Sequence, residues 1–410
     1  MGTTGYATVL GRRGVTLTIG VSAALAMVAG LAAAMSEPVP PSAPAGMPVE
    51  SKPAQPAVRR PIVQIALLLD TSNSMDGLIN QAKTQLWNIV NEFATAKKGD
   101  AKPMLNIALY QYGNDSLPPE AGFIRQELGF TDDLDAVSTK LFALTTNGGS
   151  EFCGHVIDVA TRQLSWSDNP DDLKVIVVAG NEAFTQGGVD YKASVPTAVK
   201  RGIIINTIFC GNMSEGQNSG WFDGARLGEG KFANIDQNAT ELHIDAPQDA
   251  RILSLSTLMN DTYLPCGDKG QWAKQQQELA DTMNTAASTS VGVQRAASKA
   301  SGLYVNSTWD LVDGVRDGTI KLEDVKNEDL PEAMRKMTLE EKKAYVAKQR
   351  EERERIQKEI ATLQKERAEF CARVQAEREE KDPSLLKDVI VAAMREQATR
   401  CGLTFEKKSK

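Results

Sequence analysis

A carboxylate and two hydroxyl groups are spaced two residues apart in the segment Asp70-Thr71-Ser72-Asn73-Ser74. This spacing puts the side chains of Asp70, Ser72 and Ser74 on the same side of a turning loop. Carboxylate and hydroxyl oxygens are hard ligands, and hard ligands suit Mg²⁺ or Ca²⁺. The segment therefore predicts a divalent cation site.

The residues before Asp70 form an almost continuous apolar run, Ile62-Val63-Gln64-Ile65-Ala66-Leu67-Leu68-Leu69. Such a run is typical of a strand that is buried on both faces of a sheet. Further strands are predicted at 105–112, 174–179, 202–209 and 231–235, and helices at 78–93, 134–143, 222–227 and 250–263. This alternation predicts an α/β domain with an open, doubly wound, mostly parallel sheet over residues 61–264. In such sheets ligands bind beyond the carboxyl ends of the strands, where Asp70 is expected.

Two further polar loops follow in order. Asn147-Gly148-Gly149-Ser150-Glu151 precedes a helix, and Gly180-Asn181-Glu182 follows the strand 174–179. With the first loop, this ordered trio resembles the von Willebrand factor A (VWA) domain, whose metal-ion-dependent adhesion site (MIDAS) opens with D-x-S-x-S. The resemblance implies that Ser150 takes the place of the family's Thr ligand and Asn181 that of its second Asp. Because an amide oxygen is a poorer ligand than a carboxylate, Glu182 is an alternative ligand.

The resemblance covers residues 61–264 and implies binding rather than turnover, because the metal keeps a position that an Asp or Glu of a protein partner completes. The chain lacks the G-x-S-x-G nucleophile elbow and the P-loop. Cys153 and His155, two residues apart on a predicted helix, point to different sides. Glu151 could act as a base on a metal-bound water, but nothing else in the sequence requires it. We expect a binding protein and no enzyme.

The N-terminal segment predicts export. Residues 14–34 carry no charge, follow Arg12-Arg13, and end in Ala32-Ala33-Ala34, which fits a cleaved signal peptide. Their length equally fits a membrane anchor. Both alternatives place the rest of the chain in the periplasm or cell envelope. The following residues, 35–60, form a Pro-rich segment, which we interpret as a semi-rigid linker.

The C-terminal part is predicted to be helical, with a connecting region at 265–334 and a highly charged region at 335–410. Seven apolar residues share one heptad register: Leu339, Val346, Ile356, Ile360, Leu363, Phe370 and Val374. Polar residues, including Arg353 and Arg367, interrupt that stripe. Two interpretations stay open, a coiled coil that self-associates through 335–381 and a solvated helix packed on its neighbour. A second helix, ending near Arg400, is predicted to form a hairpin with the first.

The composition of the chain limits the classes of partner that it is expected to bind. With 46 basic and 53 acidic residues the formal net charge is −7, which argues against a nucleic-acid-binding protein. Because exported cysteines tend to oxidise, Cys153 and Cys210, both predicted at the carboxyl edge of the sheet, are a candidate disulfide. Two functions remain. One is a metal-dependent adhesion or scaffold protein, and the other is a structural envelope protein that acts through its helical tail and carries a degenerate VWA domain.

Overall fold

The computed structural model describes residues 59–235, 244–377 and 386–405. The predicted signal or anchor and nearly all of the predicted linker lie outside these residues. Within them, no helix combines the length and the apolar character that a membrane crossing requires.

Six strands form one sheet in the order β4-β3-β1-β5-β6-β7. Their bounds are β1 Ile62–Asp70, β3 Met104–Tyr112, β4 Ile124–Thr131, β5 Leu173–Gly180, β6 Ile204–Cys210 and β7 Glu229–Ile235. Every neighbouring pair is parallel except β3 and β4, which run antiparallel. The predicted mostly parallel sheet is confirmed. Because the chain leaves β1 toward β3 and later returns to its other side at β5, the switch point lies at the carboxyl end of β1.

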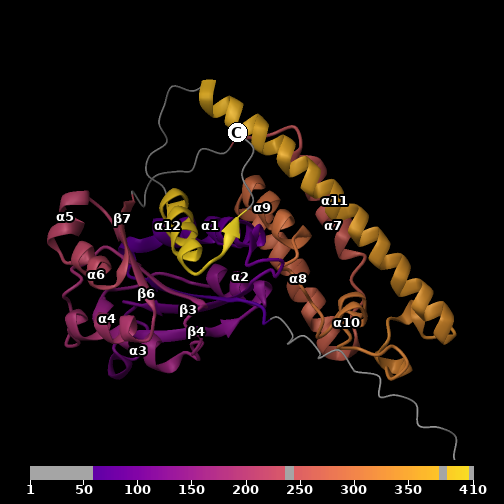
Figure 1. Cartoon of the computed structure of the whole chain (residues 1–410), viewed down its shortest axis with the longest axis horizontal. Helices are drawn as coiled ribbons and strands as arrows, with labels where there is room; N and C mark the ends of the chain where they lie inside the picture. The colour runs from indigo at the N-terminus through magenta and orange to yellow at the C-terminus, as the bar shows by residue number, and fades with distance from the viewer. Residues whose placement is uncertain (1–58, 236–243, 378–385, 406–410) are drawn as a thin grey trace, which may run out of the picture. The chain divides into compact units, whose positions relative to one another are not determined.

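Successive residues of β1 pack into different cores because strand side chains alternate between the two faces. Ile65 and Leu67 join the core under helices α1 (Asp76–Ala94) and α2 (Leu134–Phe142). Ala66 and Leu68 join the core under α3 (Cys153–Gln163), α4 (Tyr191–Lys200) and α6 (Trp221–Leu227). These two sets of helices lie on opposite sides of the sheet (Figure 1). A short helix, α5 (Met213–Asn218), follows β6.

In the described part of the chain, five α-helices lie between β7 and the last helix: α7 (Asp249–Asn260), α8 (Gly267–Ala287), α9 (Thr289–Ala300), α10 (Leu311–Asp317) and α11 (Leu339–Glu377). Helix α9 packs against α1, and α8 packs against α2, so this helical layer covers the α1 side of the sheet (Figure 1). The predicted C-terminal helical region is confirmed. It shares its core with the sheet, and the described residues belong to one compact unit.

The central part of the apolar stripe of α11 is buried within its own chain. Ile356 and Ile360 are fully buried in the core that also holds β1 and α1. Two of the polar interruptions, Arg353 and Arg367, are explained by ion pairs. Arg353 pairs with Asp310 at 2.8 Å, and Arg367 pairs with Asp249 at 2.6 Å. Of the two interpretations of this stripe, a helix packed on its neighbours agrees with the structure.

The predicted hairpin between the last two helices is wrong. Helix α12 (Leu386–Arg400) packs mainly on α1 and β7 (Figure 1). Its Gln397 exchanges two hydrogen bonds with Asn206 of β6, at 3.1 and 2.7 Å, and both residues are buried. Strand β8 (Thr404–Phe405) then pairs with β2 (Ala96–Lys97), which follows α1 along the chain. Helix α12 therefore belongs with α1 to the helices that cover one face of the sheet. Helices α7 to α11 are an insertion between β7 and α12.

Candidate metal centre

Asp70 lies at the carboxyl end of β1 with its side chain fully buried. One carboxylate oxygen, Oδ1, accepts a hydrogen bond from the backbone N–H of Ser72 at 2.8 Å. The other oxygen, Oδ2, is buried without a hydrogen-bond partner among the residues that the structure describes. A buried carboxylate oxygen without a partner is costly, and a bound cation would satisfy it.

Two glycines make room for this carboxylate. A Cβ atom at Gly180 would lie 2.7 Å from the Tyr112 hydroxyl and 3.0 Å from Oδ2 of Asp70. A Cβ atom at Gly113 would lie 2.8 Å from Oδ1, and Gly113 also has φ +77°, which favours glycine. Gly180 is the last residue of β5 and Gly113 directly follows β3, the two strands that flank β1, so the sheet itself forms the cavity for Asp70.

Ser72, Ser74 and Asn181 lie together beside Asp70. The two serine hydroxyls are 3.4 Å apart, and the side-chain amide of Asn181 donates to the Ser74 hydroxyl at 2.8 Å. The amide oxygen of Asn181 is buried without a hydrogen-bond partner in the described part of the chain. The structure thus brings together four of the predicted ligands, and two of them present unsatisfied oxygens.

Glu151 supplies a second carboxylate that the predicted ligand set omitted. Its side chain is 5% exposed, and Ser72 lies close enough to act against the rise that burial causes in the pKa of Glu151. Its backbone N–H donates to the Gln186 side chain at 2.8 Å, which holds the loop in place. The neighbouring Ser150 is half-buried. The signal for Glu151 was present in the sequence, because the replacement of an Asp by Asn181 leaves a place for one more negative charge.

Glu182, the alternative ligand, has an exposed side chain. Its backbone carbonyl accepts a hydrogen bond from the indole of Trp221 at 2.7 Å. The Glu182 carboxylate is close enough to Glu151 to raise the pKa of that residue, although burial is the larger cause. The position of Glu182 therefore suits the border of the metal centre better than the interior of that centre.

The two buried carboxylates disfavour each other's charge. Burial raises the pKa of Asp70 to about 7, and the negative charge of Glu151 adds to this effect. Burial also raises the pKa of Glu151. A divalent cation would favour the charged form of both groups and would occupy the unsatisfied oxygens. The donor set, carboxylate, hydroxyl and amide oxygens, thus fits Mg²⁺ or Ca²⁺.

The predicted disulfide between Cys153 and Cys210 is wrong, since both residues are free and buried. The Cys153 thiol lies 3.5 Å from the Tyr112 hydroxyl, in the core under α3 and α4. Cys210 belongs to the core on the opposite, α1 side of the sheet. Both residues are near the carboxyl edge as predicted, but the sheet separates their side chains.

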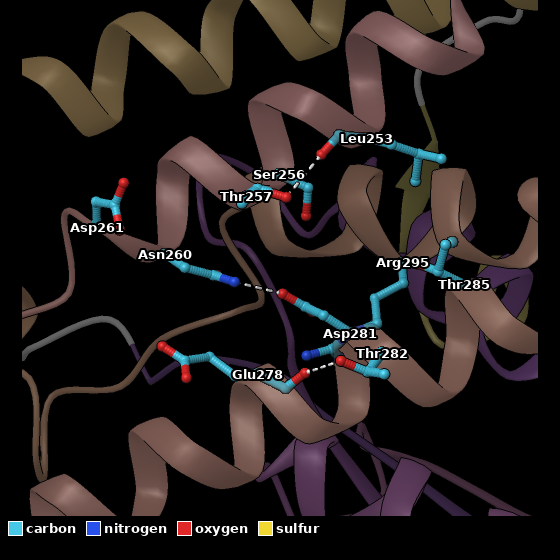
Figure 2. A pocket seen from close by; sticks show the side chains of 11 residues that line it. Leu253, Ser256, Thr257, Asn260, Asp261, Glu278, Asp281, Thr282, Thr285 and Arg295 are labelled. Atoms are coloured by element: carbon cyan, nitrogen blue, oxygen red, sulfur yellow. Dashed lines mark hydrogen bonds and ion pairs between the residues drawn. The ribbon is translucent and has the colours of Figure 1, made fainter.

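A second polar region is a cavity of about 340 Å³ between α7, α8 and α9. Figure 2 shows Asn260 and Arg295 directed toward Asp281, which lies between them. Asp281 pairs with Arg295 at 2.5 Å and with the fully buried Lys299 at 2.6 Å. These cations hold the pKa of Asp281 below its ordinary value, although burial alone would raise it. Because the charged groups pair with one another, we assign this cluster a structural role.

Residues 64–219 match a family model described as von Willebrand factor type A domain. One similar solved structure is the conserved hypothetical protein BatB from Bacteroides thetaiotaomicron, with 16% identity over 42% of this chain and 90% of that chain, at a TM-score of 0.32. A second is proximal thread matrix protein 1 from the mussel byssus, solved with a zinc-occupied MIDAS motif, with 16% identity over 43% and 42% and a TM-score of 0.32.

A third similar structure is the VWA domain of SpRpn10, with 17% identity over 42% of this chain and 87% of that chain, at a TM-score of 0.29. Likeness at these identities concerns the fold alone. A search of curated protein sequences found no match.

Proposed function

We propose that residues 64–219, which form a von Willebrand factor type A domain, bind a divalent cation and, through it, an acidic residue of a protein partner. One observation carries the proposal. Oδ2 of Asp70 and Oδ1 of Asn181 are buried in the same loop cluster, and neither has a hydrogen-bond partner among the described residues. Oxygens in this condition are explained when a cation accepts their lone pairs.

Asp70, Ser72, Ser74 and Asn181 would hold the cation, with Glu151 as the second carboxylate and the Ser150 hydroxyl at the edge of the set. A bound Mg²⁺ or Ca²⁺ would supply positive charge at a position open to an incoming carboxylate. The protein's own contribution is positional. Gly113 and Gly180 admit the Asp70 carboxylate, and the Asn181 amide orients the Ser74 hydroxyl.

The proposed setting of this binding is the periplasm or cell envelope, with residues 14–34 as a cleaved signal or as an anchor. The uncharged segment and the Pro-rich residues after it support this proposal. The partner is a protein that presents Asp or Glu, and we propose binding without catalytic turnover.

The experiment is a calorimetric titration of Mg²⁺ and Ca²⁺ into the metal-free full-length protein and its Asp70→Asn variant. Asn has the shape of Asp, so the variant removes charge and leaves the packing in place. We expect binding by the wild type and a loss of at least about tenfold in affinity in Asp70→Asn, because the charge of the ligands sets affinity. Asp158→Asn, on α3, is the matched control. Equal affinities in wild type and Asp70→Asn would contradict the proposal.

A further inference from the structure

Five loops surround the candidate metal centre at the carboxyl edge of the sheet, and we refer to them as the acidic rim. They are residues 71–75, 113–123, 143–152, 181–190 and 211–220, and the last of them includes the short helix α5. These loops contain no Lys, Arg or His, although about one residue in nine of the whole chain is Lys or Arg. Their acidic residues are Asp115, Glu120, Glu151, Glu182, Asp190 and Glu215. The charge of this edge is therefore of one sign.

The five loops form one continuous surface because direct contacts join them. Three hydrogen bonds donated by backbone N–H groups and one aromatic contact cross from loop to loop. They are Asn73 N–H to the Gly148 carbonyl (2.9 Å), Glu151 N–H to the Gln186 side chain (2.8 Å), Phe184 N–H to the Ser219 carbonyl (2.9 Å), and the Phe123 and Phe152 rings (centroids 6.0 Å apart). A partner that reaches the metal centre thus also approaches the carboxylates of the rim.

Five of the six rim carboxylates are exposed, and only Glu151 is buried. The charges of Asp70 and Glu151 would together balance one divalent cation. The exposed carboxylates then leave the rim negative even when a cation is bound. The first basic residue after the loop 181–190 is Lys192, on α4, with its ammonium 5.8 Å from the Tyr191 ring centroid. The rim itself offers no cation to balance these carboxylates.

We propose that the partner presents its metal-binding carboxylate within a cluster of Lys and Arg side chains. This inference rests on the proposed function and adds the chemistry that surrounds the captured residue. A partner surface that is acidic around that residue would be repelled by the exposed rim carboxylates, whereas a basic surround is attracted to them. The metal selects one carboxylate, and the rim selects the charge of its neighbours.

The test uses the full-length protein with saturating Mg²⁺ and immobilised peptides as probes. One peptide is Lys-Lys-Gly-Asp-Gly-Lys-Lys, and the second is Ser-Ser-Gly-Asp-Gly-Ser-Ser. A third peptide replaces the central Asp of the first by Asn. We expect the Asp peptide with Lys flanks to bind about tenfold more tightly than the one with Ser flanks at about 50 mM salt, and the difference to shrink at about 500 mM, because salt screens exposed charges.

The variant is the double substitution Glu120→Gln and Glu215→Gln, at two exposed rim positions away from the metal ligands. It should weaken the peptide with Lys flanks by at least about threefold and leave the peptide with Ser flanks and the calorimetric Mg²⁺ affinity unchanged. The matched control is Glu340→Gln with Glu351→Gln, two exposed residues of α11. The control should change neither peptide.

The outcomes separate the two proposals. If both Asp peptides bind equally at low salt and both need Mg²⁺, the inference about the rim is overturned and the proposed function stands. If the Asp and Asn peptides with Lys flanks bind equally, or if neither Asp peptide binds the Mg²⁺-loaded protein, capture of an acidic residue is overturned together with the inference.

Discussion

The guanidinium of Arg353 lies over the ring of Tyr263, with 3.8 Å between the guanidinium carbon and the ring centroid. The same group pairs with Asp310 and Asp313, at 2.8 and 3.1 Å. Arg353 thus connects α11 to the end of α7 and to the start of α10. Because all these side chains are buried, the ion pairs cannot be replaced by water.

Replacement of Arg353 by Ala should lower the free energy of unfolding by about 3–5 kcal/mol, because it leaves the buried Asp310 carboxylate without this cation. Asp313 keeps its ion pair with Arg316 at 2.9 Å. Urea denaturation measures this value. Arg350→Ala is the matched control on the same helix, since Arg350 pairs with Glu354 at the surface and should contribute less than about 1 kcal/mol. Equal losses in the two variants would contradict the assigned role of Arg353.

A methyl group at Gly180 should damage the metal centre. Gly180→Ala places a Cβ 2.7 Å from the Tyr112 hydroxyl and 3.0 Å from Oδ2 of Asp70, so the carboxylate must move. We expect a loss of at least about tenfold in Mg²⁺ affinity by calorimetry, since ligand geometry decides Mg²⁺ binding. Gly188→Ala is the control, because a Cβ there has no heavy atom within 4 Å. An unchanged affinity in Gly180→Ala would exclude Asp70 as a ligand.

Substitution of Asn181 by Asp should strengthen cation binding. The change converts a neutral oxygen donor into a carboxylate, and affinity increases with the ligand charge. In the absence of metal, the same change should destabilise the fold, because a further negative charge is placed beside Asp70 and Glu151. Calorimetry and thermal unfolding with and without Mg²⁺ measure both effects. Glu182→Gln distinguishes the alternative ligand, and we expect it to change affinity only slightly because Glu182 is exposed.

The metal-free protein should become less stable as the pH rises from about 4 to 7. Asp70 has a pKa of about 7 in the fold because of burial and of Glu151, against about 3.9 in an unfolded chain. Between these values the folded state holds a proton that the unfolded state has released, so its stability falls with rising pH. The total loss is a few kcal/mol, at about 1.4 kcal/mol for each unit of pKa difference.

Denaturation in EDTA at several pH values checks this prediction. Asp70→Asn should remove most of the slope, and saturating Mg²⁺ should also flatten it, because the cation favours the charged carboxylate. A slope that is the same in wild type and Asp70→Asn would assign the effect to other groups.

The buried strands and the Asp70 loop could be predicted because both are local. A run such as Ile65 to Leu69 has no polar residue to face solvent, and its carboxyl end is the place of ligands in parallel sheets. The role of Glu151 was harder to predict from the sequence. Whether Ser150 or Glu151 is directed into the centre depends on the backbone of the preceding loop, where Gly148 has φ +62°.

The long-range partners of the C-terminal helices could not be predicted from periodicity. The stripe of α12, with Ala393 and Met394, indicates that one face is buried but not which surface covers it. Arg353 and Arg367 were interpreted as interruptions of an apolar seam, since a charge in a stripe usually faces solvent. Their acidic partners are Asp310, directly before α10, and Asp249 on α7, and no helical period reveals them.

The insertion of α7 to α11 between β7 and α12 has a consequence for the order in which the protein is made. Gln397, the partner of Asn206, is synthesised 191 residues after it, and Thr404 bonds to Lys97 across 307 residues. Contacts so distant in the chain form late and slow folding. A nascent polypeptide that has emerged only as far as β7 lacks α9, α11 and α12, so the core on the α1 side of its sheet is incomplete. Premature termination anywhere before α12 should therefore yield a product that chaperones retain and proteases degrade, including products that carry the whole metal centre.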